Sequence, residues 1–245
     1  MAGHSKWANI KNKKEKTDSQ RGKIFTKIGR EIAVAVRSGG SDPNANSRLK
    51  DIIAKAKANN VPNDNIMRSI KKASGDVGSD AFEEIIYEGY GPGGVAVIVE
   101  ALTDNRNRTA GDVRHIFDKY GGNLGTNGCV SFMFDKKGQF IIEKTKKVDE
   151  DNLMIAALEA GALDVIGENE YYEVLTEPED FSNVLERLEN DGYSFETAEV
   201  AMIPQTTTIL SDEDMSANME KLIERLEDLE DVQNIYHNWE QEQPE

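Results

Sequence analysis

Several residue types that would define a chemical function are scarce in this chain. A single cysteine, Cys129, excludes an intramolecular disulfide and is typical of a reducing compartment. The three histidines, His4, His115 and His237, are scattered, and none lies at metal-ligand spacing from another His or Cys. No GxSxG, HExxH or Walker motif is present. We therefore expect no catalytic residue, metal, cofactor or small-molecule substrate, and we predict that the protein is not an enzyme.

Long apolar runs are missing as well. No stretch approaches the ~18 apolar residues that cross a bilayer, and no apolar segment of a secretory signal follows the basic N-terminus. These absences predict a cytoplasmic protein without a membrane partner. Cys129 lies in the short apolar stretch CVSFMF, which we predict to be a strand with a buried, inert thiol.

Charge is abundant and unevenly distributed. The 245-residue chain has a formal net charge of −16. Residues 1–75 nevertheless hold 17 Lys and Arg against 6 Asp and Glu, whereas residues 76–245 hold 12 against 39. An asymmetry of this size is typical of a protein that meets a polyanion with one of its segments.

The first residues form a basic arm with a lone tryptophan, which is the strongest candidate for a nucleic-acid contact. Lysines on such an arm neutralise phosphates and release counterions, while the Trp7 ring offers a surface for base stacking. Two other interpretations stay open: a solvated tail with Trp7 packed against the helices, and a membrane surface, which the bundle's own need for its apolar faces disfavours. The predicted nucleic-acid-binding residues of this segment are Lys6, Trp7, Lys11, Lys13, Lys14, Lys16 and Arg21.

Three helices are predicted after the arm, over residues 19–38, 48–60 and 63–75. In the first helix, apolar residues recur every four positions and Gly39-Gly40 supplies a stop signal. Lys23, Lys27 and Arg30 lie on its opposite side and extend the basic arm, so we add them to the nucleic-acid-binding set. The helices predict a basic bundle over residues 1–75.

Strand-like and helical segments alternate from residue 82 onward. Residues 136–204 read β–α–β–β–α–β, the order of a ferredoxin-like unit, and residues 81–135 and 205–239 flank it. We predict an α+β fold: the three-helix bundle, then two ferredoxin-like α+β domains, one inserted in the other. The helical segment near the C-terminus is too short for a coiled coil and is expected to pack on its own sheet.

Two motifs in the acidic residues 76–245 are candidate phosphate-binding sites. EGYGPGG lacks the lysine and Ser/Thr of a Walker loop and runs from strand to strand, so it predicts a turn with several positive φ angles. NRNRT begins a helix that Asp104 or Asn105 would cap, which places Arg106 and Arg108 beside exposed N–H groups. A phosphate contact there and a capped helix with two solvated arginines both stay open.

These stretches together resemble the YebC/PmpR family, which includes the mitochondrial translational activator of cytochrome c oxidase. The resemblance is carried by GHSKWANIKNKK, RGKIFTKI, YEGYGPGG, DNRNRT, VRHIF, GGNLGT and DVQNIYHN. It implies a three-domain protein that acts without catalysis.

The family resemblance also implies a function, in two versions. One is a nucleic-acid-binding regulator of gene expression of the kind labelled DNA-binding transcriptional regulator. The alternative is a translation factor that binds ribosomal RNA at the ribosome and eases stalled elongation, for example at proline runs. A third class, a protein-interaction module that uses the acidic face, stays open on the residues alone.

Overall fold

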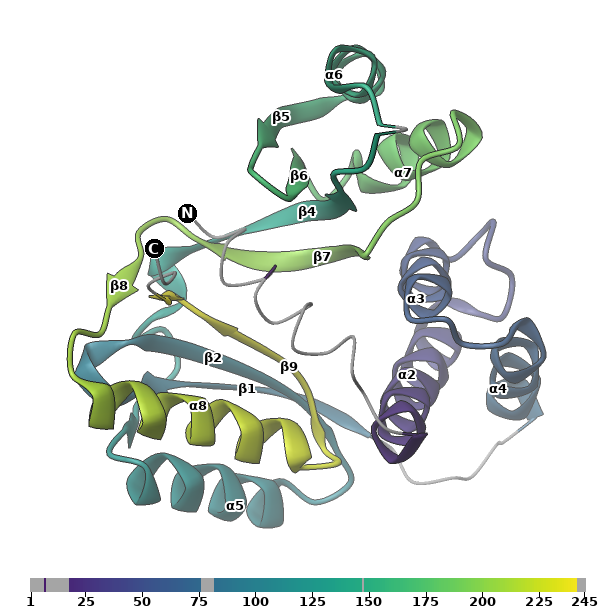
Figure 1. Cartoon of the computed structure of the whole chain (residues 1–245). Coiled ribbons are helices and arrows are strands. Elements are labelled where there is room, and N and C mark those ends of the chain that lie inside the picture. Colours follow the sequence, from purple (N-terminus) through teal and green to yellow (C-terminus); the bar gives the residue numbers. More distant parts are fainter. Residues whose placement is uncertain (1–6, 8–17, 76–81, 147, 242–245) are drawn as a thin grey trace. The chain divides into compact units, whose positions relative to one another are not determined.

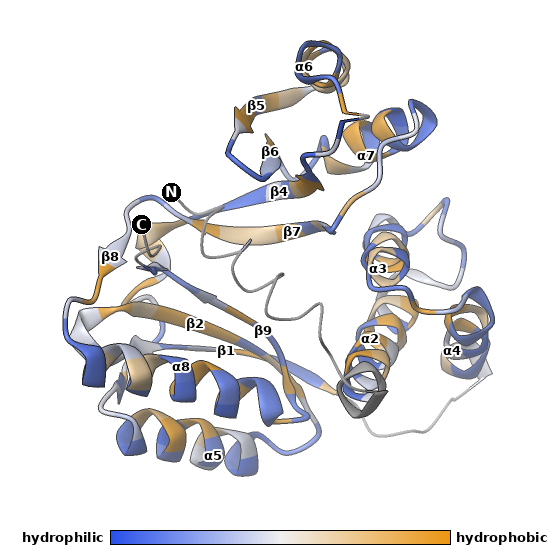
Figure 2. Cartoon of the chain, in the orientation of Figure 1, coloured by the Kyte–Doolittle hydropathy of each residue, from blue (hydrophilic) through white to orange (hydrophobic). Residues whose placement is uncertain are grey.

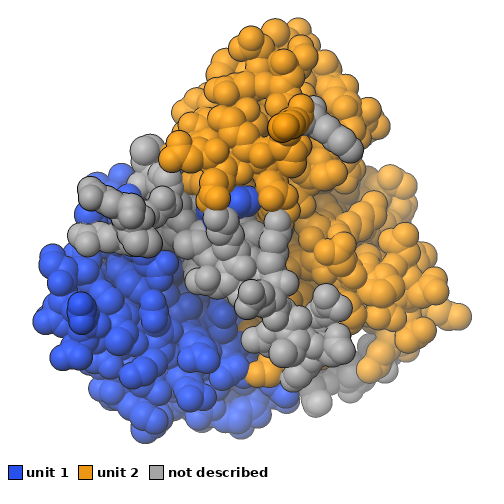
Figure 3. Space-filling model, in the orientation of Figure 1, with its two compact units in different colours: residues 1–8, 78–135, 203–245 blue, residues 9–77, 136–202 orange. Residues whose placement is uncertain are grey.

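The computed structural model describes residue 7 and residues 18–75, 82–146 and 148–241. Helices come first along the chain and largely antiparallel sheets follow, which confirms the predicted α+β class (Figure 1). The chain divides into two compact units, coloured separately in Figure 3. Unit 1 comprises Met1–Ala8, Gly78–Asp135 and Ile203–Glu245, and unit 2 comprises Asn9–Val77 and Lys136–Met202.

Unit 2 contains three helices that share one apolar core. They are α2 (Asp18–Gly39), α3 (Ser47–Ala58) and α4 (Asn63–Gly75). Ile28 and Ile32 of α2, Leu49 of α3 and Ile66 and Ile70 of α4 are buried together. The helical spacing of these residues places them on one face of each helix, so the opposite faces are left for polar and charged side chains.

Asn46 fixes the turn between α2 and α3. Its side chain accepts a hydrogen bond from the Leu49 backbone N–H at 3.1 Å and donates to the carbonyls of Ala35 and Gly40, each at 2.8 Å. One buried side chain therefore caps the start of α3 and satisfies carbonyls at the end of α2. A Cβ at position 39 would lie 2.8 Å from this side chain, so the close approach requires Gly39.

The second part of unit 2 is a four-stranded sheet with two helices. Its strands are neighbours in the order β5-β6-β4-β7, the ferredoxin-like order, and Phe140 of β4 stacks on Phe181 of α7 with ring centroids 4.8 Å apart. The elements are β4 (Phe134–Glu143), α6 (Glu150–Glu159), β5 (Ala162–Gly167), β6 (Tyr171–Thr176), α7 (Phe181–Asn190) and β7 (Thr197–Pro204).

Contacts between α3 and α7 join the helices of unit 2 to this sheet. The Ser182 hydroxyl donates to Asp51 Oδ1 at 2.9 Å, and Lys50 Nζ lies 3.6 Å from Glu186 Oε2. Burial raises the pKa of Asp51, and the hydrogen bond from Ser182 opposes this rise. Ala54 packs against the apolar core of the sheet, so α3 contributes to both parts of unit 2.

Unit 1 is built on a sheet with the strand order β3-β1-β2-β9. β1 pairs with β2 in a hairpin, and β9, which follows the long insertion, pairs antiparallel with β2. The ferredoxin-like order therefore describes the inserted sheet and not this one, whose first two strands are joined by a turn instead of a helix. The elements are β1 (Glu83–Tyr90), β2 (Ala96–Thr103), α5 (Arg106–Lys119), β3 (Asn123–Leu124), β8 (Thr208–Ile209), α8 (Glu213–Asp228), β9 (Val232–His237) and β10 (Trp239–Glu240).

Helices α5 and α8 cover one face of the unit 1 sheet (Figure 1). Val97 and Val99 of β2 are buried there with Phe117 of α5 and with Met219 and Leu222 of α8. The C-terminal helix thus packs on its own sheet, as its short apolar repeat predicts.

The segment from Cys129 to Phe134 is not the strand predicted from its apolar residues. Residues 131–133 form a 3-10 helix, β4 begins at Phe134, and Cys129 lies half-buried in the preceding turn. The reason is Glu88 of β1, whose carboxylate accepts hydrogen bonds from the backbone N–H groups of Gly128, Val130 and Ser131 at 2.7, 2.9 and 2.8 Å. These donors point to a side chain and cannot pair with a strand.

Glu88 is a buried anion that the loop stabilises. Burial alone would raise its pKa, but the hydrogen bonds from the three backbone donors outweigh that effect, and the pKa lies below its ordinary value. The folded loop therefore requires the charged carboxylate.

Replacing this carboxylate by an amide tests its role. Glu88→Gln should lower the free energy of unfolding by about 1.5–3 kcal/mol near neutral pH, the range for hydrogen bonds to a charged group. A lowered folded-state pKa contributes stability above about pH 4.5 that disappears as the pH falls through the lowered value, so the difference from wild type should shrink in acid. Urea unfolding of both proteins at neutral and acidic pH measures this difference in the free energy of unfolding. A difference that is equal at the two pH values would contradict the role of the charged Glu88 carboxylate.

Candidate nucleic-acid interface

Helix α2 carries the part of the predicted basic stripe that the structure describes. Lys23 is exposed, and Lys27 and Arg30 are half-buried. Their spacing of four and three residues aligns them along one side of the helix, while Ile28 and Ile32 are buried in the helical core. The structure thus brings these three predicted residues together on one element.

The structure describes the predicted residues of the arm only in part. Trp7 belongs to unit 1 and is 4% exposed, so its ring does not offer a free face for a base in this conformation. The backbone of Arg21 lies in α2, and its side chain lies outside the described residues. Outside them altogether are Lys6, Lys11, Lys13, Lys14 and Lys16.

A second cluster of cations lies on α4 and is absent from the predicted set. Arg68, Lys71 and Lys72 are exposed, and none of their side chains has a hydrogen bond or ion pair with the part of the chain that the structure describes. Their spacing of three and four residues places them on one side of the helix, opposite Ile66 and Ile70. The sequence signal for this cluster is the stretch MRSIKKASG, in which basic residues alternate with the core residues at helical spacing.

The helices of unit 2 retain a large excess of positive charge. Residues 22–75 hold eleven Lys and Arg against four Asp and Glu. One acid, Glu31 of α2, is already paired, because Lys55 Nζ of α3 lies 2.9 Å from its Oε1. Another, Asp51, accepts the hydrogen bond from Ser182. The surface of α2, α3 and α4 is therefore dominated by cations, as binding to phosphates requires.

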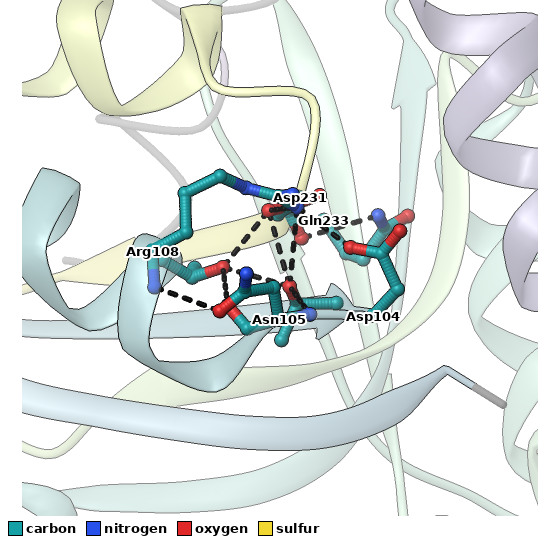
Figure 4. A network of polar contacts seen from close by, with 7 residues as sticks. Asp104, Asn105, Arg108, Asp231 and Gln233 are labelled. Carbon is teal, nitrogen blue, oxygen red and sulfur yellow. Dashed lines mark hydrogen bonds and ion pairs between the residues drawn. The ribbon is translucent and has the colours of Figure 1, made fainter. Parts of the chain in front are cut away.

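The N-terminus of α5 holds the other two predicted residues, and its cap is the expected one. Asn105 is the N-cap, with its Oδ1 accepting a hydrogen bond from the Arg108 backbone N–H at 3.1 Å. Figure 4 shows the Arg108 guanidinium turned toward Asp104 and Asp231. Its Nη2 lies 2.8 Å from Asp104 Oδ1 and 2.7 Å from Asp231 Oδ2.

Asp231 joins this helix end to the start of β9. Its Oδ2 accepts hydrogen bonds from the hydroxyls of Thr103 and Thr109 at 3.2 and 2.8 Å in addition to the one from Arg108. Burial would raise the pKa of Asp231, but the hydrogen bonds from Arg108 and Thr109 and the charge of Arg108 lower it below its ordinary value. The hydrogen bonds that Arg108 donates to Asp231 and Asp104 in turn raise the pKa of Arg108.

The two arginines of α5 therefore differ in what they can bind. Within the protein, the charge of Arg108 is balanced by the carboxylates of Asp104 and Asp231. Arg106 is 70% exposed along its side chain and lies 3.6 Å from Glu83, a surface pair that contributes little. Of the two, Arg106 is the one available to a phosphate.

Backbone geometry explains glycines in two glycine-rich stretches, EGYGPGG and GGNLGTNG (residues 121–128). Gly93 and Gly94 have φ angles of 64° and 78° in the turn between β1 and β2, as EGYGPGG predicts. A Cβ at Gly125 would lie 2.5 Å from Cys129 Sγ, so this glycine allows the loop held by Glu88 to close on the half-buried thiol. Neither stretch begins a helix of the kind that binds a phosphate.

The described residues contain neither a candidate metal site nor a candidate membrane span. Among residues 18–75, 82–146 and 148–241, no three His, Cys, Asp or Glu side chains are grouped so that they could hold a metal ion. No helix in the described part of the chain is both long and apolar enough to cross a membrane.

Known proteins share this architecture. Residues 5–76 match the domain described as the TACO1/YebC protein N-terminal domain, and residues 82–239 match the TACO1/YebC second and third domain. The chain belongs to the TACO1/YebC family. The helices α2, α3 and α4 correspond to the N-terminal domain of that family, and the two sheets lie within its second and third domains.

Relatives of this TACO1/YebC chain match it over almost its full length. A probable transcriptional regulatory protein of Acetivibrio thermocellus is 70% identical over 239 residues, which are 98% of this chain and 99% of that protein. Another, from Ruminiclostridium cellulolyticum, is 64% identical and covers 99% of this chain and 98% of its own. The crystal structure of a conserved hypothetical protein from Aquifex aeolicus has a TM-score of 0.82 at 47% identity and covers 94% of each chain.

The ion pairs of Arg108 can be tested against the exposed neighbour Arg106. Arg108→Ala leaves the Asp231 carboxylate without its cation, so its pKa should rise toward the ordinary value and the melting temperature should fall by several degrees. Arg106→Ala removes the same side chain from the same helix turn but only a solvent-exposed pair, and it should leave the melting temperature nearly unchanged. Thermal unfolding followed by circular dichroism measures both. Equal melting temperatures for the two variants would show that the Asp231 pair does not stabilise the fold.

Proposed function

We propose that this TACO1/YebC protein is a non-enzymatic regulator of gene expression that binds nucleic acid through the basic surface of α2, α3 and α4. The observation that carries the proposal is the cluster of Arg68, Lys71 and Lys72 on α4, exposed and free of acidic partners in the described structure. It lies on a domain with an excess of cations in a chain whose total charge is −16. An acidic protein gains nothing in solubility from such a cluster, so a polyanionic partner is the better explanation.

The names of the relatives support the regulatory part of this proposal. The proteins of Acetivibrio thermocellus and Ruminiclostridium cellulolyticum are called probable transcriptional regulatory proteins, and each matches this chain along nearly its whole length. A transcriptional regulator acts on DNA, so duplex DNA is the nucleic acid that we propose first. Cytoplasmic location follows from the same role.

Binding through these helices would be mainly electrostatic. Lysine and arginine side chains that neutralise phosphates release condensed counterions, which supplies affinity without reading the base sequence. Residues 76–245 hold 39 Asp and Glu against 12 Lys and Arg, and this part of the chain repels the same phosphates. The acidic part therefore confines the nucleic acid to the helices of unit 2 and to the basic arm.

Removing the α4 cluster gives the direct test. The triple variant Arg68→Ala, Lys71→Ala and Lys72→Ala should weaken binding to duplex DNA and reduce the slope of log K against log salt by about 0.9 for each phosphate that is no longer neutralised. The matched control is Arg114→Ala, Lys136→Ala and Lys221→Ala, which removes three exposed cations outside these helices and should leave the slope unchanged.

Fluorescence anisotropy with labelled DNA at several salt concentrations measures these slopes. Equal losses of affinity in the two triple variants would contradict a localised interface. A wild-type protein that binds structured RNA tightly and duplex DNA weakly would contradict DNA as the target while leaving the basic surface as the binding face.

The arm can be tested separately from α4. Replacing Lys11, Lys13, Lys14 and Lys16 by Ala should also flatten the salt dependence, by about 0.7–0.9 per phosphate according to whether the nucleic acid is single- or double-stranded. Lysine side chains seldom contribute to an apolar core, so the melting temperature should stay unchanged. An unaltered salt slope would exclude the arm from the interface and leave the helices as the whole binding surface.

A further inference from the structure

Helix α6 of the inserted sheet is apolar on two sides. Leu153, Ala156 and Ala157 are buried in the core of the sheet. On the solvent side, Met154, Ile155 and Leu158 are 38%, 56% and 47% exposed. These three residues are one and three positions apart along the helix, so their side chains share one side of it. Figure 2 shows hydrophobic and hydrophilic residues along the α6 ribbon. Large aliphatic side chains gathered in this way mark an interaction site more often than a neutral surface.

The edge strand that follows α6 carries another exposed aliphatic side chain. β5 is the edge of its sheet, and its register with β6 shifts between Ala162 and Asp164. Leu163 is the extra residue of this bulge, and it is 50% exposed. A bulge changes the direction of a side chain, and here it turns a leucine to solvent five residues after Leu158. We call Met154, Ile155 and Leu158 the α6 patch.

Acidic residues predominate in the sequence around the α6 patch, and one of them, Glu159, is paired with Arg187 of α7, whose Nη2 lies 3.4 Å from its Oε2. Residues 148–186 contain twelve Asp and Glu and no Lys or Arg. Asp151 and Glu159 on α6 and Asp164 beside Leu163 are all exposed. Asp151 and Glu159 each lie four residues from Ile155, so they border it on both sides along the helix. The surface is an apolar centre with an acidic rim, the arrangement of a protein-binding site with a few anchoring side chains.

We propose that the α6 patch binds a basic amphipathic helix of a partner protein. The apolar side of such a helix would cover Met154, Ile155 and Leu158, and lysines or arginines beside it would meet Asp151 and Glu159. Nucleic acid and anionic lipid are disfavoured because their phosphates would face carboxylates. Two α6 patches brought together would oppose their acidic rims, which disfavours a second copy of this chain. This inference does not depend on nucleic-acid binding, which uses other helices.

A designed peptide tests the proposed chemistry with the full-length protein. The probe is a fluorescent 18-residue peptide with leucines along one side of a helix and lysines on the other sides. Two control peptides have the same composition in scrambled order and glutamate in place of lysine. Anisotropy at physiological salt should show binding of the probe, with both control peptides at least about tenfold weaker.

Variants of the protein locate the binding site. Ile155→Ser with Leu158→Ser should lower the affinity for the probe peptide about tenfold or more, because it removes anchoring side chains. The matched control Ile86→Ser with Phe132→Ser removes two other exposed apolar side chains, 48% and 69% exposed, and should leave the affinity within about twofold. Asp151→Lys with Glu159→Lys keeps the apolar centre and reverses the rim, and it should also weaken the lysine probe. The serine variants replace exposed side chains, so their melting temperatures should stay unchanged.

Three results would overturn the proposal. The first is equal affinity of the probe for wild type and for the Ile155→Ser, Leu158→Ser variant. The second is equal binding of the scrambled peptide. The third is self-association of the wild type in sedimentation that the same variant abolishes, because the occupant would then be a second copy. DNA binding by this variant should match wild type, so failure here is distinguishable from failure of the proposed function.

Discussion

The pairing of β2 with β9 is the interaction on which unit 1 depends. It joins Val97 to His237 and Val99 to Ile235, residues on opposite sides of the inserted sheet in the sequence. Next to this pairing, the buried Asn238 accepts a hydrogen bond from the Ala96 backbone N–H at 2.8 Å and donates to Thr208 Oγ1 at 3.1 Å. Without this pairing, β2 would be an open edge of the sheet.

The same pairing makes the insertion compatible with the fold. The entropy of closing a loop rises slowly with its length, so a long excursion between β3 and β8 is tolerated when its ends are fixed. The excursion also folds on its own core, in which Phe140 stacks on Phe181. The return to β9 brings Asp231 beside Arg108 and links the two segments of unit 1 by charge as well as by backbone hydrogen bonds.

Features that depend on local sequence were predictable, and features that depend on distant partners were not. The helices, the Gly39-Gly40 stop, the cap by Asn105 and the ferredoxin-like order of the inserted strands all have signals within a few residues. By contrast, Arg108 binds Asp231, which lies 123 residues away, so local reasoning left its charge open to a phosphate. Glu88 likewise controls a loop about 40 residues downstream, and an apolar run became a turn. The α4 cluster had a local signal in its spacing, but the arm's greater density of lysine concealed it.

Segregation of charge along the chain would separate the two proposed kinds of recognition. A phosphate backbone is attracted to the cations of α2 and α4 and repelled by a segment with twelve acids and no base. Screening limits both effects to ~8 Å at physiological salt, so each acts only near its own surface. An exposed aliphatic surface in a neutral setting would attract apolar segments of many kinds, including other copies of itself. Because acidic side chains border the α6 patch, a partner bound there would need positive charge beside its apolar side chains, and the same carboxylates would repel nucleic acid.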